Sequence, residues 1–419
     1  MNQYAVVGGT IWGNRGAEAM VVTTIGRIRD RDPEASFLLM SYFPDRDRDL
    51  VADPLVRVVD ATPTQTVVQF SFALICWVAS LIRIRVPDLM LPASVRQLRR
   101  CRAVFDVSGV SFHDGRLAVV AYNLMCVWPA LLLGVPVLRL SQAMGPFRNP
   151  LNRIPARLVT KHSLHTFARG RRSADYLREL KVPLESWSLA SDVAFSYRPE
   201  DSLSIESLDQ VNQLATDLEE IRSRGKNVVA LVPSSLVYQK TTEDGGDYVA
   251  LLLHLIVELQ ERGLHLLVVP NATRAGHDAA RNNDLVVIEE LRNRIEVGVQ
   301  GVDRDAITYV DFDLNTASIR RLIESCALLI TSRFHAMVAA LALGVPTLVM
   351  GWSHKYEEVL ESFGCADHAV DFAEAEYKLV PMAASLLAER ERIHQRILES
   401  LPEVVASSTS QFDWVNRLD

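Results

Sequence analysis

The sequence predicts an α/β protein built from two doubly wound, parallel-sheet domains that face a cleft. The chain has 419 residues, and at about 150 residues per domain this length predicts two or three domains with full-sized cores. Apolar residues make up 49% and charged residues 23% of the chain, which excludes disorder as its main state. Short apolar runs alternate with helical patterns from one end to the other, which is typical of parallel sheets with crossover helices.

The first domain is predicted over residues 1–196. Its strands are expected at residues 4–9, 37–42, 103–107, 136–140 and 165–168. Its helices are expected at residues 17–29, 117–133, 151–161 and 173–180. In the first helix apolar residues recur on one face until Pro33 ends the pattern, so this helix should pack against the sheet.

The second domain follows a polar stretch, residues 197–226, which is predicted to be the linker and the first helix of that domain. The domain itself is predicted over residues 227–383, and residues 384–419 form a C-terminal helix that could cross back to the first domain. Strands are expected at residues 227–232, 264–269, 307–310, 327–331 and 347–350. Helices are expected at residues 248–262, 285–294, 316–325, 334–343 and 356–363.

Charge and cysteine content narrow the functional classes. With 44 Lys+Arg against 51 Asp+Glu, the net charge of −7 excludes a surface that binds nucleic acid as a whole, so an anionic substrate needs a local basic pocket. The five cysteines are widely spaced and include no Cys-x-x-Cys pair, which argues against a disulfide framework and a structural zinc site. The N-terminus lacks a secretory signal pattern, and we therefore expect a cytoplasmic protein.

One apolar segment leaves two interpretations open. Residues 67–82 carry no charge and are followed by Arg83 and Arg85. The run is shorter than the roughly 20 residues of a spanning helix. We favour a buried or domain-packing helix; the alternative is an interfacial helix that makes peripheral contact, through residues 67–85, with the inner face of the plasma membrane.

In doubly wound sheets, ligands bind beyond the carboxyl ends of the strands, so the residues there are the candidates for function. The first strand is followed by GGTIWGNRGAEAM, which contains neither G-x-G-x-x-G nor a P-loop. Glu18 in the first helical turn would oppose a phosphate, whereas Asn14, Arg15 and Glu18 can all hydrogen-bond hydroxyl groups. A sugar suits this set better than a nucleotide; alternatively, Glu18 only complements the helix dipole.

The strand that ends near Val107 continues into VSGVSFHDG. His113 and Asp114 on this loop suit hydroxyl recognition or proton transfer. A Ser/His/Asp hydrolase is disfavoured, because the G-x-S-x-G nucleophile motif is absent from the loop.

The most informative segment is TSRFHAMVAALALGVPTLVMGWSHKYEEVLESFG. Ser332, Arg333 and His335 follow a buried strand at the start of a small-residue helix, whose free N–H groups and dipole favour an anion. Arg333 offers a planar fork for a carboxylate or phosphate, and His335 can exchange a proton near neutrality. The next strand brings His354 and Lys355 to the same sheet edge, which predicts one basic cluster; the alternative is a set of solvated charges with His335 as a helix cap.

Two further sets follow strands. In FARGRR, Arg169 is nearest the strand end, and we expect it to reach the cleft, whereas the other arginines form a solvated face. Asp311 and Asp313 could hold a divalent metal beside a nucleotide-sugar diphosphate. We favour a turn and a helix N-cap formed by Asp313 and Asn315.

Together these segments resemble the polysaccharide pyruvyl transferase family. The similarity is strongest in SRFHAMVAALALGVPTLVMGWSHKYEEVL, and weaker blocks follow the expected order: GNRGAEAM, VSGVSFHDG, SQAMGPF, and ARGRRSADYLRELKV with SDVAF. It covers most of residues 6–361. The resemblance implies two Rossmann-like domains, as in GT-B glycosyltransferases. It also implies transfer of a pyruvyl group from phosphoenolpyruvate to two hydroxyls of a sugar, forming a cyclic ketal.

The resemblance gives the candidate residues roles in that chemistry. His335 would be the general acid, and Glu18 or Asp114 the base for the sugar hydroxyls. Donor-binding residues would be Arg333, Lys355, Arg169, Ser332 and His354. Acceptor-binding residues would be Asn14, Arg15 and His113. We expect phosphoenolpyruvate as co-substrate, no metal and no other cofactor.

The expected acceptor is a sugar of a cell-envelope or exported glycan or glycolipid, and it could be lipid-linked. The alternatives are a GT-B-like glycosyltransferase that uses a nucleotide sugar, and a non-enzymatic sugar-binding factor. Two departures from the family pattern stand out. Many relatives have Val-Arg-Asp where this chain has Ala168, Arg169 and Gly170, and many have Tyr near the final Lys where this chain has Trp352, which could stack on the ligand.

Overall fold

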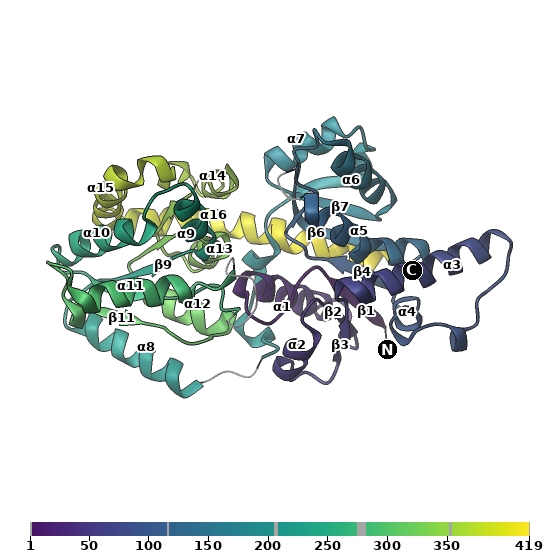
Figure 1. The fold of residues 1–419 in the computed structure, drawn as a ribbon, viewed down its shortest axis with the longest axis horizontal. Coiled ribbons are helices and arrows are strands. Elements are labelled where there is room, and N and C mark those ends of the chain that lie inside the picture. Colours follow the sequence, from purple (N-terminus) through teal and green to yellow (C-terminus); the bar gives the residue numbers. More distant parts are fainter. Residues whose placement is uncertain (1, 115–116, 205–207, 275–281, 352–353, 419) are drawn as a thin grey trace. The chain divides into compact units, whose positions relative to one another are not determined.

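A computed structural model describes residues 2–114, 117–204, 208–274, 282–351 and 354–418. The chain forms two compact units, each built on one parallel sheet (Figure 1). The first unit comprises Met1–Trp12, Ala17–Ile205 and Val405–Asp419, and the second comprises Gly13–Gly16 and Glu206–Val404. The first unit thus extends beyond the predicted end at residue 196, and it takes in the last residues of the chain.

The sheet of the first unit has the order β3-β2-β1-β4-β6-β7-β8, with the short β5 beside β6, and its strand pairs are all parallel. The strands are β1 (Gln3–Val7), β2 (Ser36–Ser41), β3 (Val56–Asp60), β4 (Ala103–Asp106), β5 (Val110–Ser111), β6 (Val137–Met144), β7 (His165–Arg169) and β8 (Trp187–Ala190). The helices are α1 (Arg15–Arg29), α2 (Pro44–Leu50), α3 (Pro63–Leu81), α4 (Ala93–Leu98), α5 (Leu117–Leu132), α6 (Pro150–His162) and α7 (Arg171–Glu179). The central strands are buried over almost their whole length, as the apolar runs predict.

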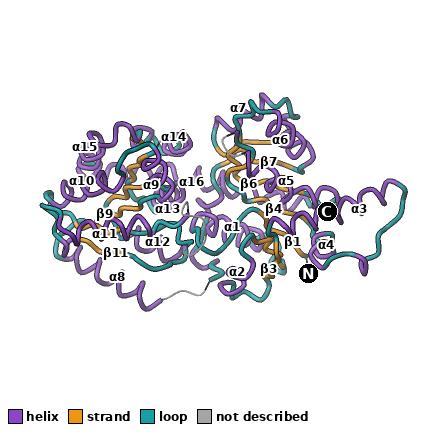
Figure 2. Tube along the Cα trace, in the orientation of Figure 1, coloured by secondary structure: helices purple, strands orange, loops and turns teal. Residues whose placement is uncertain are grey.

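The strand order turns at β1, and this fixes which helices share a face. The chain moves one way from β1 to β3 and the other way from β4 to β8. Because parallel crossovers are right-handed, α1 and α2 cover one face of the sheet, and α3 to α7 cover the other. Consistently, α3 packs against α4 and α5, and α5 packs against α6. Figure 2 shows the strands with helices on both faces.

The sheet of the second unit has the order β11-β10-β9-β12-β13-β14 and is also parallel throughout. Its strands are β9 (Val228–Val232), β10 (His265–Val268), β11 (Ile307–Tyr309), β12 (Leu328–Thr331), β13 (Thr347–Met350) and β14 (Ala369–Val370). Its helices are α8 (Leu208–Ser223), α9 (Ser235–Glu243), α10 (Tyr248–Gln260), α11 (Leu285–Gly298), α12 (Thr316–Glu324), α13 (Phe334–Ala342), α14 (His354–Glu361) and α15 (Ala375–Ala388). Helix α16 (Arg390–Ser410) begins in this unit and ends in the first.

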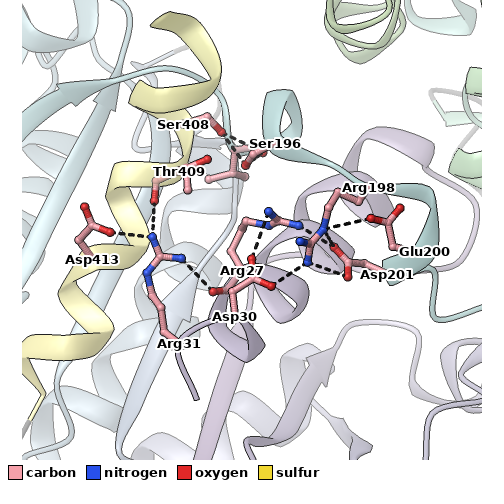
Figure 3. Close-up of polar contacts among 11 residues, drawn as sticks. Arg27, Asp30, Arg31, Ser196, Arg198, Glu200, Asp201, Ser408, Thr409 and Asp413 are labelled. Atoms are coloured by element: carbon pink, nitrogen blue, oxygen red, sulfur yellow. Dashed lines mark hydrogen bonds and ion pairs between the residues drawn. The ribbon is translucent and has the colours of Figure 1, made fainter. Parts of the chain in front are cut away.

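The C-terminal segment is fixed to the first unit by polar contacts. Arg31, in the turn after α1, donates hydrogen bonds to Asp413 at 2.6 Å and to the Thr409 carbonyl at 3.3 Å (Figure 3). The hydroxyls of Ser196 and Ser408 lie 2.9 Å apart. Phe412, in the 3₁₀ helix Gln411–Arg417, is fully buried. These contacts make residues 405–419 part of the first unit's structure.

The expectation that residues 67–82 form a buried helix is wrong. The segment lies in α3, of which only Thr66, Gln69 and Ala73 are buried. Only 17% of its apolar window is covered by the rest of the molecule. By length and composition α3 is the one helix in the described ranges that could cross a membrane. Most apolar side chains of α3 therefore do not pack in the core of the first unit, because the buried stripe of the helix is narrow.

His165 on β7 is buried against the C-terminal segment. Its ring stacks on Trp414 with a centroid distance of 4.5 Å, and its Nε2 lies 2.9 Å from the Ser188 hydroxyl. Burial, together with the nearby positive charge of Arg417, lowers the pKa of His165 to about 4. The imidazole is therefore neutral in the folded protein at neutral pH.

We expect this buried histidine to make the protein less stable as the pH falls from about 6.5 to about 4. In that window an unfolded chain binds a proton at His165 that the folded chain does not, so acid favours unfolding. His165→Phe keeps an aromatic ring and removes the titration, so its urea-unfolding midpoint should fall less than that of the wild type between pH 7 and 4.5. His254→Phe, at an exposed position, is the control and should follow the wild type. Parallel curves for all three proteins would contradict the prediction.

Candidate functional site

A group of polar side chains in the second unit follows the carboxyl ends of β12 and β13. These strands are parallel neighbours, with Ile330 opposite Leu348 and Thr331 opposite Val349. The residues that follow them therefore emerge side by side at one edge of the sheet. Arg333 is the N-cap residue of α13, so the free N–H groups of that helix point to the same place.

Arg333 is held by a buried carboxylate. Its Nε donates to Asp284 at 3.1 Å, its Nη2 donates to the same oxygen, and Nη2 also donates to the Ser235 hydroxyl at 2.9 Å. Asp284 is fully buried, whereas the Arg333 side chain is 13% exposed. Within the part of the chain that the structure describes, no acceptor meets Nη1 of Arg333. The pair thus fixes the guanidinium and leaves one edge of it for a ligand.

Asp284 also joins the loops that surround the site. It accepts hydrogen bonds from the amides of Ser235 at 2.8 Å, Asn271 at 3.1 Å and Ala272 at 2.9 Å. Ser235 follows β9, Asn271 and Ala272 follow β10, and Arg333 follows β12. One carboxylate therefore links the ends of three strands. The sequence analysis missed Asp284, because an aspartate just before an apolar helix is typical of an N-cap. Its side chain makes no capping hydrogen bond to α11 and faces Arg333 instead.

Two tyrosines fix Ser332. The Tyr248 hydroxyl lies 3.2 Å from the Ser332 hydroxyl, and the Tyr356 hydroxyl donates to the Ser332 carbonyl at 3.0 Å. Burial raises the pKa of both Tyr248 and Tyr356 to about 12, so both remain protonated donors at neutral pH. Ser332 itself is buried. It therefore supports the geometry of the strand end.

His335 lies in the first turn of α13, against the backbone of Gly16. A Cβ atom on Gly16 would be 2.2 Å from Nδ1 of His335, a distance that no side chain tolerates. The glycine-rich segment that follows β1 therefore contributes to the surroundings of His335 in the second unit. Only a glycine allows this close approach at residue 16.

The structure assigns Asn14 and Arg15 to the second unit, whereas the sequence analysis assigned them to the first domain. The Arg15 amide donates to the Asn271 carbonyl at 3.1 Å, and the Thr316 hydroxyl donates to the Arg15 carbonyl at 2.9 Å. The Arg15 guanidinium is buried, with Nη2 3.5 Å from a carboxylate oxygen of Asp313. The Asn14 side chain accepts from the Gly16 amide at 3.1 Å. These contacts fit a role for both residues in shaping the loop.

Lys355 lies near the beginning of α14, and its side chain returns toward α13. Its Nζ is 5.5 Å from the centre of the Phe334 ring and 5.1 Å from that of Tyr356. Such cation–π contacts hold the ammonium group beside Phe334, which lies between Arg333 and His335 in the sequence. His354 is the first residue of α14, but its side chain and the whole of Trp352 lie outside the described residues.

In the first unit, Arg169 ends β7 and is buried. Its Nη1 is 2.5 Å from a carboxylate oxygen of Asp192, and the side chain is 5% exposed. Asp192 belongs to the SDVAF block and also accepts from the Ala194 amide at 2.9 Å. The acid that is missing after Arg169 in the sequence is thus supplied by Asp192. This pairing defines how Arg169 points, which the sequence left open.

The two candidate bases differ in their surroundings. Glu18 is buried in the first turn of α1 and accepts a hydrogen bond from the Ser204 hydroxyl at 3.2 Å. Asp114 accepts from the Arg148 amide at 2.7 Å, the Asn149 amide at 3.2 Å and the Asn152 side chain at 2.8 Å. Partial burial opposes the shift, but these hydrogen bonds together lower the pKa of Asp114. The lowered pKa makes Asp114 a weaker base than an ordinary aspartate.

The loop that carries His113 rests on a buried ion pair. Arg139 is fully buried, with its Nε 3.1 Å from Asp106 and its Nη2 2.7 Å from the Ser111 hydroxyl. These contacts join β4, β5 and β6 beneath the loop. His113 itself is exposed. Sequence patterns did not reveal this pair, because Arg139 lies inside an apolar strand.

The Asp-x-Asp pair makes structural contacts. Asp311 forms an ion pair with Arg292 at 3.2 Å, and Asp313 accepts from the Thr273 hydroxyl and faces Arg15. Asn315 caps α12 by accepting from the Ser318 amide at 2.9 Å, so its predicted capping role is confirmed. Among the residues described, no group of three or more His, Cys, Asp or Glu side chains could hold a metal ion.

Comparison with known proteins gives one family. A family model for polysaccharide pyruvyl transferase matches residues 14–354, which is most of the chain and includes the Arg333 and His335 helix. No curated protein matches the chain in sequence.

Solved structures show the fold class. A UDP-GlcNAc 2-epimerase from Neisseria meningitidis, bound to UDP-GlcNAc, is similar with a TM-score of 0.56 and 11% identity over 100% of both chains. HepE from Anabaena, in complex with UDP-glucose, has a TM-score of 0.55 and 11% sequence identity, over 100% of this chain and 99% of that one. A UDP-GlcNAc 2-epimerase from Methanocaldococcus jannaschii has a TM-score of 0.52 and 11% sequence identity, over 96% of this chain and 100% of that one. The predicted class, two parallel-sheet α/β domains of GT-B type, is confirmed.

Proposed function

The chain belongs to the polysaccharide pyruvyl transferase family, and on this premise we propose that it transfers the enolpyruvyl group of phosphoenolpyruvate to two hydroxyls of one sugar. The products would be a cyclic pyruvate ketal and inorganic phosphate. The observation that carries the proposal is the edge formed by β12 and β13. There a fixed arginine, a histidine and a lysine gather at the start of one helix.

The donor suits this edge because it places a carboxylate and a phosphate on a three-carbon frame. Convergent cations and backbone N–H groups recognise such anions. We assign donor binding to Lys355 and to Arg333, whose Nη1 edge faces the ligand. Ser332 fixes the end of β12 from which Arg333 follows. His354 and Arg169 stay as weaker candidates for the same role, since one side chain is not described and the other is paired with Asp192.

The reaction we propose begins with His335 as a protonated imidazole. It donates a proton to the methylene carbon, which becomes a methyl group, and C2 becomes an oxocarbenium centre. The first sugar hydroxyl adds to C2 and gives up its proton to a base, for which Glu18 and Asp114 are the candidates. The C2–O bond to phosphate then breaks, and Arg333 and Lys355 stabilise the departing charge.

The second hydroxyl closes the ring on C2. Its proton and that of the first hydroxyl balance the proton placed on the methyl carbon and the one taken up by the released phosphate. No oxidant or reductant enters the scheme. The acceptor we propose is a sugar of a cell-envelope or exported glycan, free or lipid-linked, with Asn14, Arg15 and His113 as candidate contacts. The reaction would take place in the cytoplasm, where phosphoenolpyruvate is made.

Arg333→Ala tests the donor site by kinetics. It should raise the KM for phosphoenolpyruvate about tenfold or more, because the guanidinium contact to the bound donor is lost, and it should lower kcat less, because Lys355 still stabilises the departing phosphate. Phosphate release in the presence of the acceptor glycan measures both constants. Arg292→Ala removes an exposed ion pair elsewhere and should leave both unchanged.

Calorimetry separates this function from its alternatives. Binding of phosphoenolpyruvate without binding of uridine diphosphate supports the pyruvyl transferase. The reverse result would favour a nucleotide-sugar glycosyltransferase. Binding of neither, with binding of the acceptor glycan alone, would favour a sugar-binding factor. Mass spectrometry of envelope glycans from a deletion strain then identifies the acceptor by its lost pyruvyl group.

A further inference from the structure

Helix α3 presents an apolar face that the first unit does not cover. Its buried residues, Thr66, Gln69 and Ala73, form one narrow stripe, and the Gln69 side chain donates to the Asp60 carbonyl at 2.9 Å. The remaining circumference is largely exposed, with Ile75 at 53% and Leu81 at 64%. A contiguous apolar surface of this kind on a soluble protein marks a contact site.

The segment after α3 extends the same surface and adds positive charge. Ile82, Ile84, Leu89 and Met90 are between 57% and 92% exposed. Arg83 and Arg85 alternate with the isoleucines and are also exposed. No carboxylate among the described residues pairs with either arginine. Apolar and basic side chains therefore face solvent together.

Helix α6 repeats this pattern on the same side of the sheet. It belongs to the layer formed by α3, α5 and α6, in which α5 packs against both of the others. Its exposed apolar residues are Leu151 at 74%, Ile154 at 59% and Leu158 at 40%, spaced as one helical stripe. Three exposed basic residues flank the stripe: Arg153, Arg157 and Lys161.

The charge distribution along the chain matches this surface. Residues 61–87 and residues 115–174 contain no Asp or Glu, although the whole chain has a net charge of −7. Acidic side chains are thus absent from the segments that carry α3, α5 and α6. Helices α3, α5 and α6 of this acidic protein therefore present a surface complementary to anions. In the segment 82–90 the one acidic residue, Asp88, forms ion pairs with Arg99 and Arg100.

A cavity of about 620 Å³ opens beside α3. Its lining includes three arginines and several apolar side chains: Arg83, Arg85, Arg99, Trp77, Ile84 and Leu132. Cations next to apolar groups suit an amphiphile with a phosphate headgroup and a hydrocarbon chain. Trp77 has the side chain that most favours the boundary between water and lipid.

From these observations we propose that α3, the segment 82–90 and α6 form a surface that binds an anionic phospholipid bilayer. The helices lie on the bilayer, because the stripe of Thr66, Gln69 and Ala73 keeps α3 docked on its own unit while the opposite face enters the lipid. The basic residues bind headgroup phosphates, and the cavity holds the headgroup of one lipid. The surface, hereafter the lipid-binding face, does not depend on the proposed reaction, since binding needs no turnover.

Vesicle flotation of the full-length protein tests the proposal. Wild-type protein should float with vesicles of phosphatidylcholine and phosphatidylglycerol, and should float about tenfold less with pure phosphatidylcholine or at high salt. Arg83→Glu with Arg85→Glu should lower partitioning into the anionic vesicles about tenfold or more. Leu81→Ser with Ile84→Ser should also lower partitioning into the anionic vesicles, even at low salt, because these two apolar side chains no longer insert into the lipid.

Matched controls change the same charge or apolarity in the second unit. Arg224→Glu with Arg392→Glu alters exposed arginines, and Val297→Ser removes an apolar side chain that is 90% exposed. Both controls should float like the wild type. The proposal is overturned if the wild type does not float, or if the variants and their controls float equally. It is also overturned if the wild type is a stable dimer that Leu81→Ser with Ile84→Ser dissociates, since a second copy would then cover the face.

Discussion

Replacing His335 with glutamine should lower kcat for phosphate release from phosphoenolpyruvate by about 100- to 10,000-fold, the range that a positioned general acid contributes. Glutamine keeps a polar side chain of similar length against Gly16 but cannot deliver a proton to carbon. Binding of phosphoenolpyruvate should change little, because Arg333 and Lys355 remain. Calorimetry and a phosphate-release assay with the acceptor glycan measure the two effects separately.

His254→Gln is the matched control, since this residue is exposed on α10, away from the strand ends. It should retain full activity. Normal turnover by the His335→Gln protein would remove His335 from the mechanism without touching the assignment of the donor site. Loss of donor binding in the same variant would instead give His335 a binding role.

Replacing Asp284 with alanine should lower the free energy of unfolding by about 3–5 kcal/mol, because it leaves the Arg333 charge unpaired in a buried site. The amides of Ser235, Asn271 and Ala272 would lose their acceptor as well. Affinity for phosphoenolpyruvate should fall together with stability, since the guanidinium would no longer be fixed. Urea denaturation followed by circular dichroism measures the first effect, and calorimetry measures the second.

Two comparisons separate the causes. Asp311→Ala removes the acid of an exposed ion pair and should cost less than about 1 kcal/mol. The double change Asp284→Leu with Arg333→Met replaces the buried pair by apolar groups, so it should recover part of the stability and none of the donor affinity. If Asp284→Ala proved as stable as the wild type, the carboxylate would not be the support of the site.

The fold class followed from the sequence because the central strands are continuous apolar runs and the crossover helices have one apolar stripe. Short or peripheral elements escaped this reasoning. Strands β3 and β8 lie toward the edges of the first sheet and include exposed residues, so their patterns are weak. The α3 run is as apolar as a core helix, and composition alone does not say which side of a helix is covered.

The sequence could predict the site residues that have a characteristic residue type and directly follow a strand. Ser332, Arg333, His335 and Lys355 follow adjacent strands, and the parallel register brings them to one edge. Their partners come from distant parts of the chain, as Asp284 does for Arg333 and Asp192 does for Arg169. A carboxylate 49 residues before the arginine that it holds leaves no local pattern.

Each of the two units is assembled from separated stretches of chain, and this has a consequence for how such genes can recombine. A hybrid that joined the front portion of one relative to the back portion of another would place a foreign tail into the first unit. There Gln411 accepts from the Ser141 amide at 3.0 Å, and Phe412 fills the interior. A viable exchange must therefore carry residues 405–419 along with the N-terminal part, so inheritance of this tail should track the first unit and not the second.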